Sequence, residues 1–577
     1  MFKKKAITVA VQAGMTFVIA NSLGLGAAWA AAPADKSSSL EEIVVTAQFR
    51  EQNVQDTPLS ITAISGEMLE SRSQTNLAEI ANQAPNVTLK PQGAAYGPSM
   101  AASIRGVGQY DFNPALEPGV GIYVDDVYYA TLTGSTLDLL DLDRVEILRG
   151  PQGTLAGKNS IGGAVKLYSR KPTGQGGSIS GTYGSRDRID LRASGDFAIS
   201  DNLFMRITGV SKRQDGYIDR IDYGCSHPDS GVPILKPVGN DCKVGTLGDV
   251  DYSALRAELA WDATSNLEIL ASVDYTSDVR TPAGSVIVQG STTVNPNAQP
   301  VPGVTHLAPS DFVPPYGSYY NYASFYNPPA TFTRLVAPLT STPALETRPV
   351  LGVNFKGSGG SLDATWKLSP TLTLKSITGY RTYDSYFTND NDLSPLSLSL
   401  GYGNLAFHSI SEELRLSGTA LENNRLDYTV GAFYLDQKSI YATVQDLRYS
   451  ATGLTQFQGN DPVNADTKAL FAHVSYHFTD ALTTNLGIRN TDEHKDYTFV
   501  RRTYSGALHP TLGVLEAGNP RNYDGSKYDY RVNLQYDWNK DLMTYVQYAT
   551  GFKGGGVSPR PFSPAQAVPF NPEKLKS

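Results

Sequence analysis

LDLLDLDRVEILRGPQGTLAGKNSIGGAVKLYSRKP, residues 137–172, is the most informative stretch of this chain. The apolar run Val145–Leu148 predicts a short strand, which ends at the sequence RGPQG. Small residues follow, and Ala164–Tyr168 predicts a second strand. Glycine at this density allows turns with positive φ and close approach between elements. The stretch therefore predicts two strands joined by a compact glycine-rich connection.

A phosphate-binding loop is the first alternative for such a connection. That motif would need a glycine five residues before Gly157, where Gln152 stands. It would also need Ser or Thr after Lys158 to hold magnesium, and Asn159 occupies that position. The sequence therefore argues against a nucleotide site here, and leaves a generic glycine-rich turn as the remaining alternative.

The first thirty residues have the pattern of a secretory signal peptide. Lys3, Lys4 and Lys5 precede an apolar stretch that runs to about Ala28, and AWA at 28–30 fits a small-x-small cleavage site. Glycines and polar residues interrupt the stretch, which argues against a membrane anchor helix. We therefore expect residues 1–30 to direct export and to be removed.

Charge and cysteine content narrow the class of protein further. The formal net charge is -8, and it becomes -11 without the first thirty residues, which carry three lysines and no acid. An acidic surface argues against nucleic acid as a partner. The two cysteines, Cys225 and Cys242, share one polar loop, and His227 is the one histidine close by. In an exported protein this favours a Cys225–Cys242 disulfide over a metal site.

From about residue 173 onward the chain alternates in polarity with a period of two. The segments at 188–197, 266–276 and 530–538 each place apolar side chains on one face and polar side chains on the other. Strands of roughly 9–11 residues are long enough to cross a bilayer when tilted. Because hydrocarbon offers no partner for bare N–H and C=O groups, strands cross it as a closed sheet.

The connections between these strands alternate in length. Short turns fall at residues such as 200–202, 264–266 and 539–541, and they alternate with long polar segments. This asymmetry is typical of a transmembrane β-barrel with the short turns in the periplasm, and a soluble propeller or sandwich would lack it. We expect aromatic residues at strand ends to form girdles at the two interfaces: Tyr252, Trp261, Trp366, Tyr383, Tyr476, Phe478, Tyr536 and Trp538.

Together these features resemble the TonB-dependent outer-membrane receptors, and residues 137–172 resemble the plug domain of that family. TPLSITAI at 57–64 resembles its opening strand, NLAEIANQA at 76–84 its short helix, and GIYVDDV at 121–127 its central strand. The plug motifs that carry the resemblance are Arg105 and Gly106, and Arg149, Gly150, Pro151 and Gly153. The family role implied for Arg105, Arg149, Glu146 and Asp143 is to pair charge within the plug or against the barrel wall.

A short segment before the plug resembles the TonB box. EIVVTA lies in a polar stretch that we expect to be flexible, residues 31–52, and its β-branched residues suit an extended backbone. The resemblance implies β-strand addition to a periplasmic TonB-type protein. The residues concerned are Glu42, Ile43, Val44, Val45, Thr46 and Ala47.

The resemblance also predicts the domains and the fold class. We expect a signal peptide at 1–30, the flexible TonB-box segment at 31–52, an α+β plug at 53–172 and a transmembrane β-barrel at 173–577. We count about thirteen strands where plugged transporters of this kind have about 22, and residues 551–555 and 570–575 resemble the middle of the family's barrel. We therefore expect an incomplete barrel and a truncated or fragmentary receptor, which would not assemble alone.

The expected function is energised import across the bacterial outer membrane. The implied partners are a TonB-type protein, outer-membrane lipid and a small extracellular ligand such as a ferric siderophore, with cobalamin and saccharides as alternatives. A passive porin would need neither plug nor TonB box, and an enzyme would need a nucleophile with its base, which we cannot nominate; we predict no catalytic residue, metal or cofactor. A loop dense in aromatics is a candidate ligand site, although packing over the barrel mouth explains it equally well: Phe312, Tyr316, Tyr319, Tyr320, Tyr322, Phe325 and Tyr326.

Overall fold

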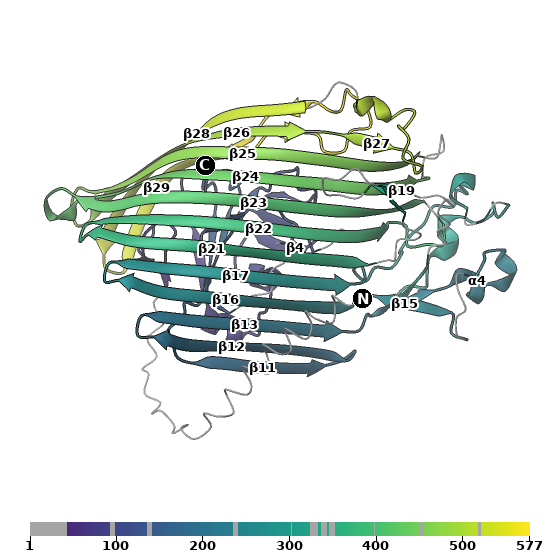
Figure 1. Cartoon of the computed structure of the whole chain (residues 1–577), viewed down its shortest axis with the longest axis horizontal. Helices are drawn as coiled ribbons and strands as arrows, with labels where there is room; N and C mark the ends of the chain where they lie inside the picture. Colours follow the sequence, from purple (N-terminus) through teal and green to yellow (C-terminus); the bar gives the residue numbers. More distant parts are fainter. Residues whose placement is uncertain are drawn as a thin grey trace, which may run out of the picture.

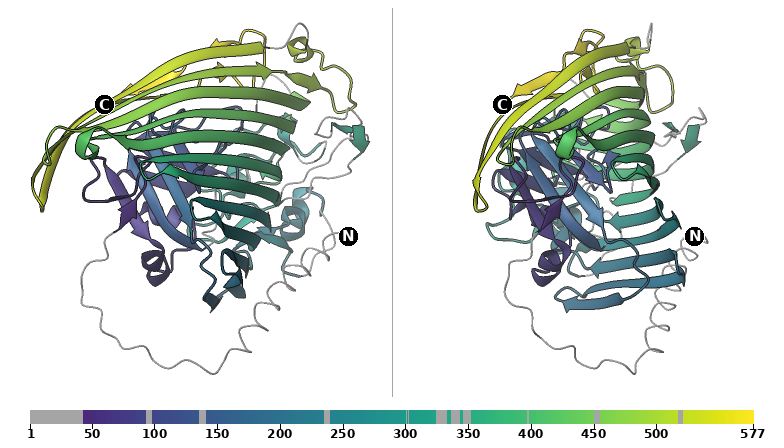
Figure 2. Two further views of the ribbon diagram at one scale, coloured as in Figure 1. Left: turned by 60° about the vertical axis from the view of Figure 1, so that its left-hand side comes forward. Right: turned by 90° about the vertical axis from the view of Figure 1, so that its left-hand side faces the viewer.

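The computed structural model contains a small α+β unit seated against the concave face of one large curved sheet (Figures 1 and 2). The signal segment, Glu42, Phe325 and Tyr326 lie outside the described residues. The described residues are 43–92, 98–134, 141–234, 240–299, 301, 303–323, 333–335, 343–345, 352–396, 398–449, 455–516 and 521–577.

The small unit is built on a five-stranded sheet in the order β3-β9-β10-β7-β8. Two of its strands, β9 and β10, come from the stretch 137–172, as predicted, and they pair antiparallel. β10 also pairs parallel with β7, so it lies at the centre of the sheet. The bounds are β3 Ile61–Ser65, β7 Val120–Val124, β8 Val127–Tyr129, β9 Leu142–Arg149 and β10 Gly163–Ser169.

Two short helices follow β3 and are fixed by their N-caps. The Ser65 side chain accepts a hydrogen bond from the backbone of α2 (Gly66–Ser71). Asn76 and Glu79 form a capping box at α3 (Leu77–Ala81), inside the segment where a helix was predicted. Both helices contribute to a core with the sheet, and a second small sheet joins β4 (Val87–Pro91), β5 (Met100–Ile104) and β6 (Val107–Gln109). The core includes Ile64, Leu69, Leu77, Ile80, Ile104, Ile122, Val145, Ile147 and Val165.

Two glycines explain the turn between β9 and β10. Gly150 has φ +93°, which glycine adopts without the steric cost that a side chain imposes. At Gly163 a Cβ would lie 2.1 Å from the carbonyl oxygen of Leu148, so the two strands meet closely only without a side chain.

The large sheet has fifteen strands among the described residues, and neighbours along it pair antiparallel. It is open, because β11 and β32 end the path and do not pair with each other. The all-β class with an N-terminal plug is therefore confirmed, and the total of 22 strands stays a prediction. The path runs β11 (Gly177–Gly184), β12 (Arg188–Ser200), β13 (Leu203–Gln214), β16 (Val250–Thr264), β17 (Leu267–Arg280), β21 (Val353–Ser369), β22 (Leu372–Asp390), β23 (Ser399–Ala420), β24 (Leu426–Leu447), β25 (Thr455–His477), β26 (Leu482–Tyr497), β28 (Arg521–Asn539), β29 (Leu542–Lys553) and β32 (Glu573–Lys576), with β27 (Val500–Arg502) paired to β25.

The outer face of the sheet is apolar, whereas the inner face carries many buried polar residues beside one apolar patch that packs on the plug. In β28, Val532 and Leu534 are 48% and 45% exposed, whereas Asn533 between them is fully buried. A water-soluble sheet would show the opposite pattern, so the outer face suits hydrocarbon. Buried polar residues of the inner face include Arg206, Arg256, Arg415, Thr467, Asn485, Arg489, Arg531 and Asn533.

The two edges of the sheet differ as predicted. Short turns join strands at one edge, for example between β12 and β13, whereas long connections emerge from the other edge, on the right in Figure 1. The long connections carry β14 (Ile218–Ile221), α4 (Tyr223–Ser226), β15 (Lys243–Leu247) and β18 (Tyr320–Tyr322). No helix among the described residues is long and apolar enough to cross a membrane.

The aromatic-girdle prediction is wrong for Tyr383, and also for Tyr252, which pairs with Lys212 on the face where Lys212 donates to Thr75 of the plug. Trp261, Trp366 and Trp538 are exposed on the outer face, as expected for a girdle. Tyr383 is instead 8% exposed, and its ring stacks on Phe407 with centroids 5.2 Å apart. It occupies an inward position of β22, because strand alternation sets the face and proximity to a strand end does not.

Replacing Val273 by Arg should destabilise the sheet within the membrane. Val273 is 62% exposed near the middle of β17, and Arg at mid-bilayer costs about 2–4 kcal/mol. Val288, in the long connection after β17, is 86% exposed, so Val288→Arg is the matched control. We expect less folded Val273→Arg protein in outer-membrane fractions and an unchanged level of Val288→Arg protein; equal levels would show that the outer face does not meet lipid.

Candidate functional site

The segment that resembles the TonB box is folded against the plug. Val44–Val45 forms β1 and pairs antiparallel with Gln52–Asn53 (β2), and Val45 is fully buried. We expected a flexible stretch here, but residues 43–53 form a hairpin in the described structure. Hydrogen bonds from its backbone and its side chains to residues of the plug stabilise the hairpin.

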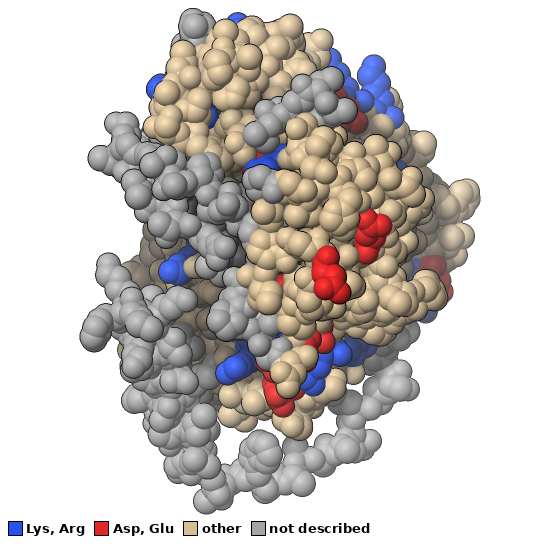
Figure 3. Space-filling view, turned by 90° about the vertical axis from the view of Figure 1, so that its right-hand side faces the viewer, with Lys and Arg blue, Asp and Glu red and all other residues tan. Residues whose placement is uncertain are grey.

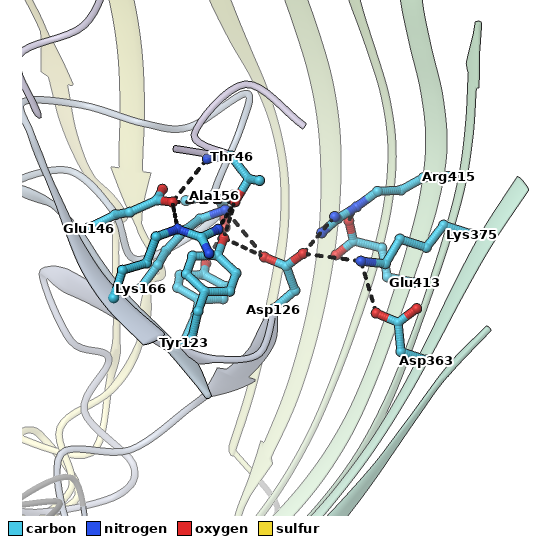
Figure 4. Close-up of polar contacts among 12 residues, drawn as sticks. Thr46, Tyr123, Asp126, Glu146, Ala156, Lys166, Asp363, Lys375, Glu413 and Arg415 are labelled. Atoms are coloured by element: carbon cyan, nitrogen blue, oxygen red, sulfur yellow. Dashed lines mark hydrogen bonds and ion pairs between the residues drawn. The ribbon is translucent and has the colours of Figure 1, made fainter. Parts of the chain in front are cut away.

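Thr46 makes the polar contacts that hold this segment (Figure 4). Its backbone N–H donates to Glu146 Oε1 over 2.9 Å, and its hydroxyl donates to the hydroxyl oxygen of Tyr168 over 2.8 Å. Arg144 donates both to Thr46 Oγ1, at 3.0 Å, and to Glu146 Oε1, at 2.9 Å. Glu146 is fully buried, so its carboxylate depends on these donors for solvation.

A turn of two aspartates connects the contacts of Thr46 with the inner face of the large sheet. Asp125 and Asp126 lie between β7 and β8, both with positive φ. Tyr168 donates its hydroxyl to Asp126 Oδ1 over 3.2 Å, and Arg415 of β23 donates to Asp126 Oδ2 over 2.9 Å. Thr46, Tyr168, Asp126 and Arg415 thus form one chain of hydrogen bonds, which we call the Thr46 relay. Figure 4 labels Thr46, Asp126 and Arg415 of this chain.

Cations dominate the environment of Asp126. Burial alone would raise the pKa of this carboxyl, but Arg415, Lys166 and Lys375 outweigh burial and hold the pKa well below its usual value. Lys166 lies 3.4 Å and Lys375 3.8 Å from its oxygens. Asp126 is therefore charged throughout the physiological pH range.

A large cavity adjoins the Thr46 relay toward the short-turn edge of the sheet. Its volume is about 1210 Å³, and it lies between the plug and the inner faces of strands from β11 to β23. Thr46, Asp126, Tyr168, Arg256 and Arg415 are among its lining residues. The part of the plug that carries the Thr46 relay therefore borders open space at the short-turn edge of the sheet, the predicted periplasmic side.

The residues after the TonB-box segment contact β24 and β25, the strands next to β23. Phe49 stacks on Phe471 of β25 with ring centroids 5.6 Å apart, and Arg50 pairs with Asp427 of β24. His477 also reaches Asp427, at 2.9 Å. The segment thus touches the barrel as well as the plug.

A second polar cluster joins plug and sheet, and sequence reasoning missed it. Lys158 Nζ lies 3.3 Å from Glu117 and 3.0 Å from Glu493 of β26, and Lys495 of β26 also pairs with Glu117. Each of the four residues is at most 7% exposed. We call these two lysines and two glutamates the buried quartet. Burial raises the pKa of Glu117, but Lys158 and Lys495 outweigh it and lower the pKa to about 2.

Two of the predicted plug-motif residues, Pro151 and Gly153, lie against the last strands of the sheet. The Gly153 N–H donates to the Thr550 carbonyl of β29 over 3.2 Å, and a Cβ at Gly153 would lie 2.6 Å from that oxygen. Gly153 therefore permits backbone contact between plug and sheet. Pro151 sits against Gly551, and Gly106 has φ +78°.

The charge pairs expected for the plug motifs occur in part. Glu146 and Asp143 each pair with Arg144, at 2.9 Å. Arg105 and Arg149 form no ion pair within the described ranges. Burial, and after it repulsion from the Arg105 guanidinium, lowers the pKa of Arg149.

The extracellular connections contain the predicted disulfide partners. Cys225 and Cys242 are joined, with a Cα–Cα distance of 5.6 Å. They lie beside a loop core that includes Tyr223, whose ring centroid is 4.8 Å from that of Phe312 and 5.0 Å from that of Tyr322.

This packing involves part of the candidate ligand loop, in line with the alternative that the loop packs over the barrel mouth. Phe312 is fully buried and Tyr322 is 8% exposed, so both support the loop core. Tyr320 packs against the same core, whereas Tyr316 and Tyr319 are exposed, and Phe325 and Tyr326 lie outside the described residues. Figure 3 views this end of the molecule, where charged side chains on the visible described surface are scattered among uncharged ones.

Comparison with known proteins gives matches across both parts of the chain. Residues 53–164 match the TonB-dependent receptor plug domain, and residues 307–577 match the TonB-dependent receptor-like β-barrel. The iron-regulated outer membrane virulence protein of Vibrio cholerae is 30% identical over 225 residues, 35% of this chain and 32% of that protein. The ferripyoverdine receptor of Pseudomonas aeruginosa is 27% identical over 260 residues, 42% of this chain and 30% of that protein. The matched region thus spans about a third of these relatives.

Solved structures share the fold at low identity. The ferric yersiniabactin uptake receptor of Yersinia pestis superposes with a TM-score of 0.64 at 18% identity, covering 90% of this chain and 68% of that one. A siderophore receptor of Acinetobacter baumannii gives a TM-score of 0.61 at 14% identity, covering 91% of this chain and 70% of that one. With both domain matches, these findings show that the chain belongs to the TonB-dependent receptor family of outer-membrane β-barrel proteins.

Proposed function

We propose that this receptor imports an iron–siderophore complex across the bacterial outer membrane, driven by a TonB-type protein. The Thr46 relay is the observation that carries the proposal, because it links the TonB-box segment to the plug and to the barrel wall. The names of two relatives, an iron-regulated outer membrane protein and a ferripyoverdine receptor, support iron as the cargo. Cobalamin or a saccharide is the alternative cargo.

Release of residues 43–47 is the proposed signal to the energy source. Hydrogen bonds with Glu146, Tyr168 and Arg144 hold Thr46, each with a net value of about 0.5–1.5 kcal/mol. Ligand binding can shift the equilibrium between the docked and the released segment by the difference in its affinity for these two states. A difference of a few kcal/mol is sufficient and attainable. Once released, Val44 and Val45 can exchange their pairing with β2 for the edge of a partner's sheet.

The contacts also indicate which part of the plug resists pulling. Separating the buried quartet would leave charges unpaired in a dry site, which costs about 3–5 kcal/mol for each broken pair. The TonB-box segment is held by fewer charges. The proton-motive force at the inner membrane supplies the pulling force. Force applied to the TonB-box segment should therefore free that segment before residues 117–159 move.

The domain boundaries are part of this proposal. We propose a signal peptide at 1–30, a TonB-box segment at 31–52, the plug at 53–172 and barrel strands at 173–577. The family consists of transport receptors and not enzymes. A passive porin is disfavoured because an open pore would need neither a plug against the inner face nor a docked segment at Thr46.

Deleting residues 43–47 should separate import from binding. Uptake of the ferric siderophore should vanish because TonB has no strand to pair with, whereas ligand binding at the extracellular side should persist. Uptake of radioactive iron and binding to whole cells measure the two quantities. Unchanged uptake would favour a passive porin.

Weakening the contact at Glu146 should expose the TonB-box segment. We propose Val45→Cys as a reporter, because Val45 is fully buried and the two natural cysteines are joined. In that background, Glu146→Ala should raise the rate of maleimide labelling about tenfold, the effect of losing about 1.4 kcal/mol. Glu70→Ala is the control, because Glu70 makes an exposed pair with Arg170. Equal labelling in both variants would contradict the proposed docking.

Replacing Glu117 by Gln should loosen the plug in a pH-dependent way. With its pKa lowered to about 2, charged Glu117 stabilises the docked plug above the ordinary pKa of 4.5, and this contribution is lost as pH falls toward 2. Hydrogen exchange of the Asn159 amide, which donates to the Phe552 carbonyl over 2.8 Å, reports docking.

At pH 7 the exchange at Asn159 should be much faster in Glu117→Gln than in the wild type. The difference should shrink as pH falls from about 4.5 to about 2. Glu268→Gln is the control, since Glu268 forms an exposed pair with Lys171, of the kind usually worth less than about 1 kcal/mol. A difference that stays constant down to pH 2 would contradict a structural role for the Glu117 charge.

A further inference from the structure

Two cavities follow one another along the same side of the plug. The larger is the cavity of about 1210 Å³ beside the Thr46 relay, and the smaller, nearer the long-connection edge, has a volume of about 50 Å³, enough for a few water molecules. Both lie between the plug and the inner faces of β17, β21, β22 and β23, which we call the cavity wall. On β17, Ser272 lines the larger cavity and Asp274, the next inward residue, lines the smaller one, so a single layer of side chains separates them.

The separating layer is polar and comes from both the plug and the sheet. Arg381 of β22 donates to Asp274 Oδ1 over 2.6 Å, and its guanidinium lies 4.4 Å from the centre of the Tyr129 ring of the plug. Arg256 of β16 lines the larger cavity and pairs with Asp125 of the plug. The plug thus contributes to the layer two residues of its β7–β8 hairpin.

This layer has hydrogen-bonding groups that it does not use. Arg256 is 6% exposed, and its Nε has no hydrogen-bond partner among the described residues. Within the same residues, Nε of Arg381 and Oδ2 of Asp274 are also buried without a partner. Arg381 and Asp274 line the smaller cavity and Arg256 lines the larger one. The unused donors on both sides of the layer suit a polar, oxygen-rich solute that passes from one cavity to the other.

Small residues leave room along the cavity wall. Gly357, Gly359 and Ser361 are successive inward positions of β21. Gly379 of β22 faces the plug, because a Cβ there would lie 2.6 Å from Val127 Cγ1 of the β7–β8 hairpin. Glycine within a strand marks a place where another group comes close to the backbone. Displacement of the hairpin would therefore leave a path with few protruding side chains.

The plug is held differently on its two sides. Away from the cavity wall, the backbone N–H groups of Gly153 and Asn159 donate to carbonyl groups of β29, and the buried quartet joins the plug to β26. At the cavity wall, the ion pairs of Asp125 and Asp126 are made by side chains beside the larger cavity. Charged pairs that water can reach are separated at lower cost than pairs in a dry site. The tip of the β7–β8 hairpin is therefore the easier contact to release.

The same hairpin is connected to the TonB-box segment. Tyr168 accepts a hydrogen bond from the Thr46 hydroxyl and donates its own hydroxyl to Asp126. Release of Thr46 lets the Tyr168 side chain reorient, and one of the hydrogen bonds that fix the hairpin tip is then lost. Pulling on the TonB-box segment therefore acts on the plug residues that close the passage between the two cavities.

We propose that the imported chelate crosses the plug along the cavity wall, after the hairpin tip moves away from Arg256 and Arg381. The two arginines receive oxygen-bearing groups of the chelate through their unused Nε–H groups, first Arg381 and then Arg256. Tyr128, which packs into the apolar patch, stays in place as the pivot of the movement, and the other side of the plug stays attached to β26 and β29. The inference rests on the proposed import and specifies its route.

Disulfide locks on the two sides of the plug test this route. Val127→Cys with Gly379→Cys ties the hairpin to β22, since the two positions are in contact. Thr154→Cys with Gly487→Cys is the matched control, which ties the other side to β26, because a Cβ at Gly487 would lie 3.1 Å from Thr154 Cβ. The natural cysteines are joined to each other and leave no competing thiol among the described residues.

The readout is iron uptake by iron-starved native cells in which each variant replaces the wild-type receptor. The probe is radioactive ferric chloride, which the chelators secreted by these cells bind. We expect the hairpin lock to lower uptake at least about tenfold and a phosphine reductant to restore it. The control lock should leave uptake unchanged.

Uptake that survives the hairpin lock, or that both locks abolish, would overturn the route and leave the proposed import intact. If the hairpin lock does not form, or if uptake does not return on reduction, labelling of Gly359→Cys decides. A charged methanethiosulfonate should label this variant about tenfold faster in energised than in uncoupled cells, and equal rates would overturn the route. Uptake that stays unchanged when the receptor itself is deleted would contradict iron import, and the route with it.

Discussion

The absence of hydrogen-bond partners in hydrocarbon is the constraint on which this structure depends. Every N–H and C=O that crosses the bilayer must be paired by a neighbouring strand, so the chain forms long antiparallel strands with few interruptions. The same constraint places apolar side chains on the outer face and polar side chains inside. Asn533, fully buried between the exposed Val532 and Leu534, shows this inversion within three residues.

Two kinds of contact hold the plug against this inner face. A hydrophobic cluster joins Tyr128 and Leu155 of the plug to sheet residues such as Phe407. Charged contacts join Asp126 with Arg415 and form the buried quartet around Glu117. Such contacts are specific in geometry, yet they can be exchanged for water when the plug moves. The Thr46 relay adds the TonB-box segment to this arrangement, so that one network joins the periplasmic handle, the plug and the wall.

The sequence predicted those strands and helices that depend on a few neighbouring residues. The strands on either side of the glycine-rich connection, the helix at Asn76 and the alternation of β28 each follow from a few neighbouring residues. Contacts between distant residues could not be predicted, because Glu117 and Lys495 are 378 positions apart and their pairing depends on the assembled sheet. The number of aromatic residues in the loop also did not predict which of them are buried, since Phe312 is buried and Tyr316 is exposed. Two adjacent aspartates directly after a buried strand were the one local signal that could have pointed to the Thr46 relay.

Zero-length carbodiimide coupling in intact outer membranes tests most directly whether the plug sits inside the sheet. Asp126 of the plug lies 3.8 Å from Lys375 of β22, and both line the periplasmic cavity, where a small reagent has access. Mass spectrometry should detect an isopeptide bond between these two residues. The exposed Lys243–Asp219 pair within the long connections, at 2.6 Å, shows that the reagent works. Coupling at the second pair with none between Asp126 and the barrel wall would contradict a plug seated within the barrel.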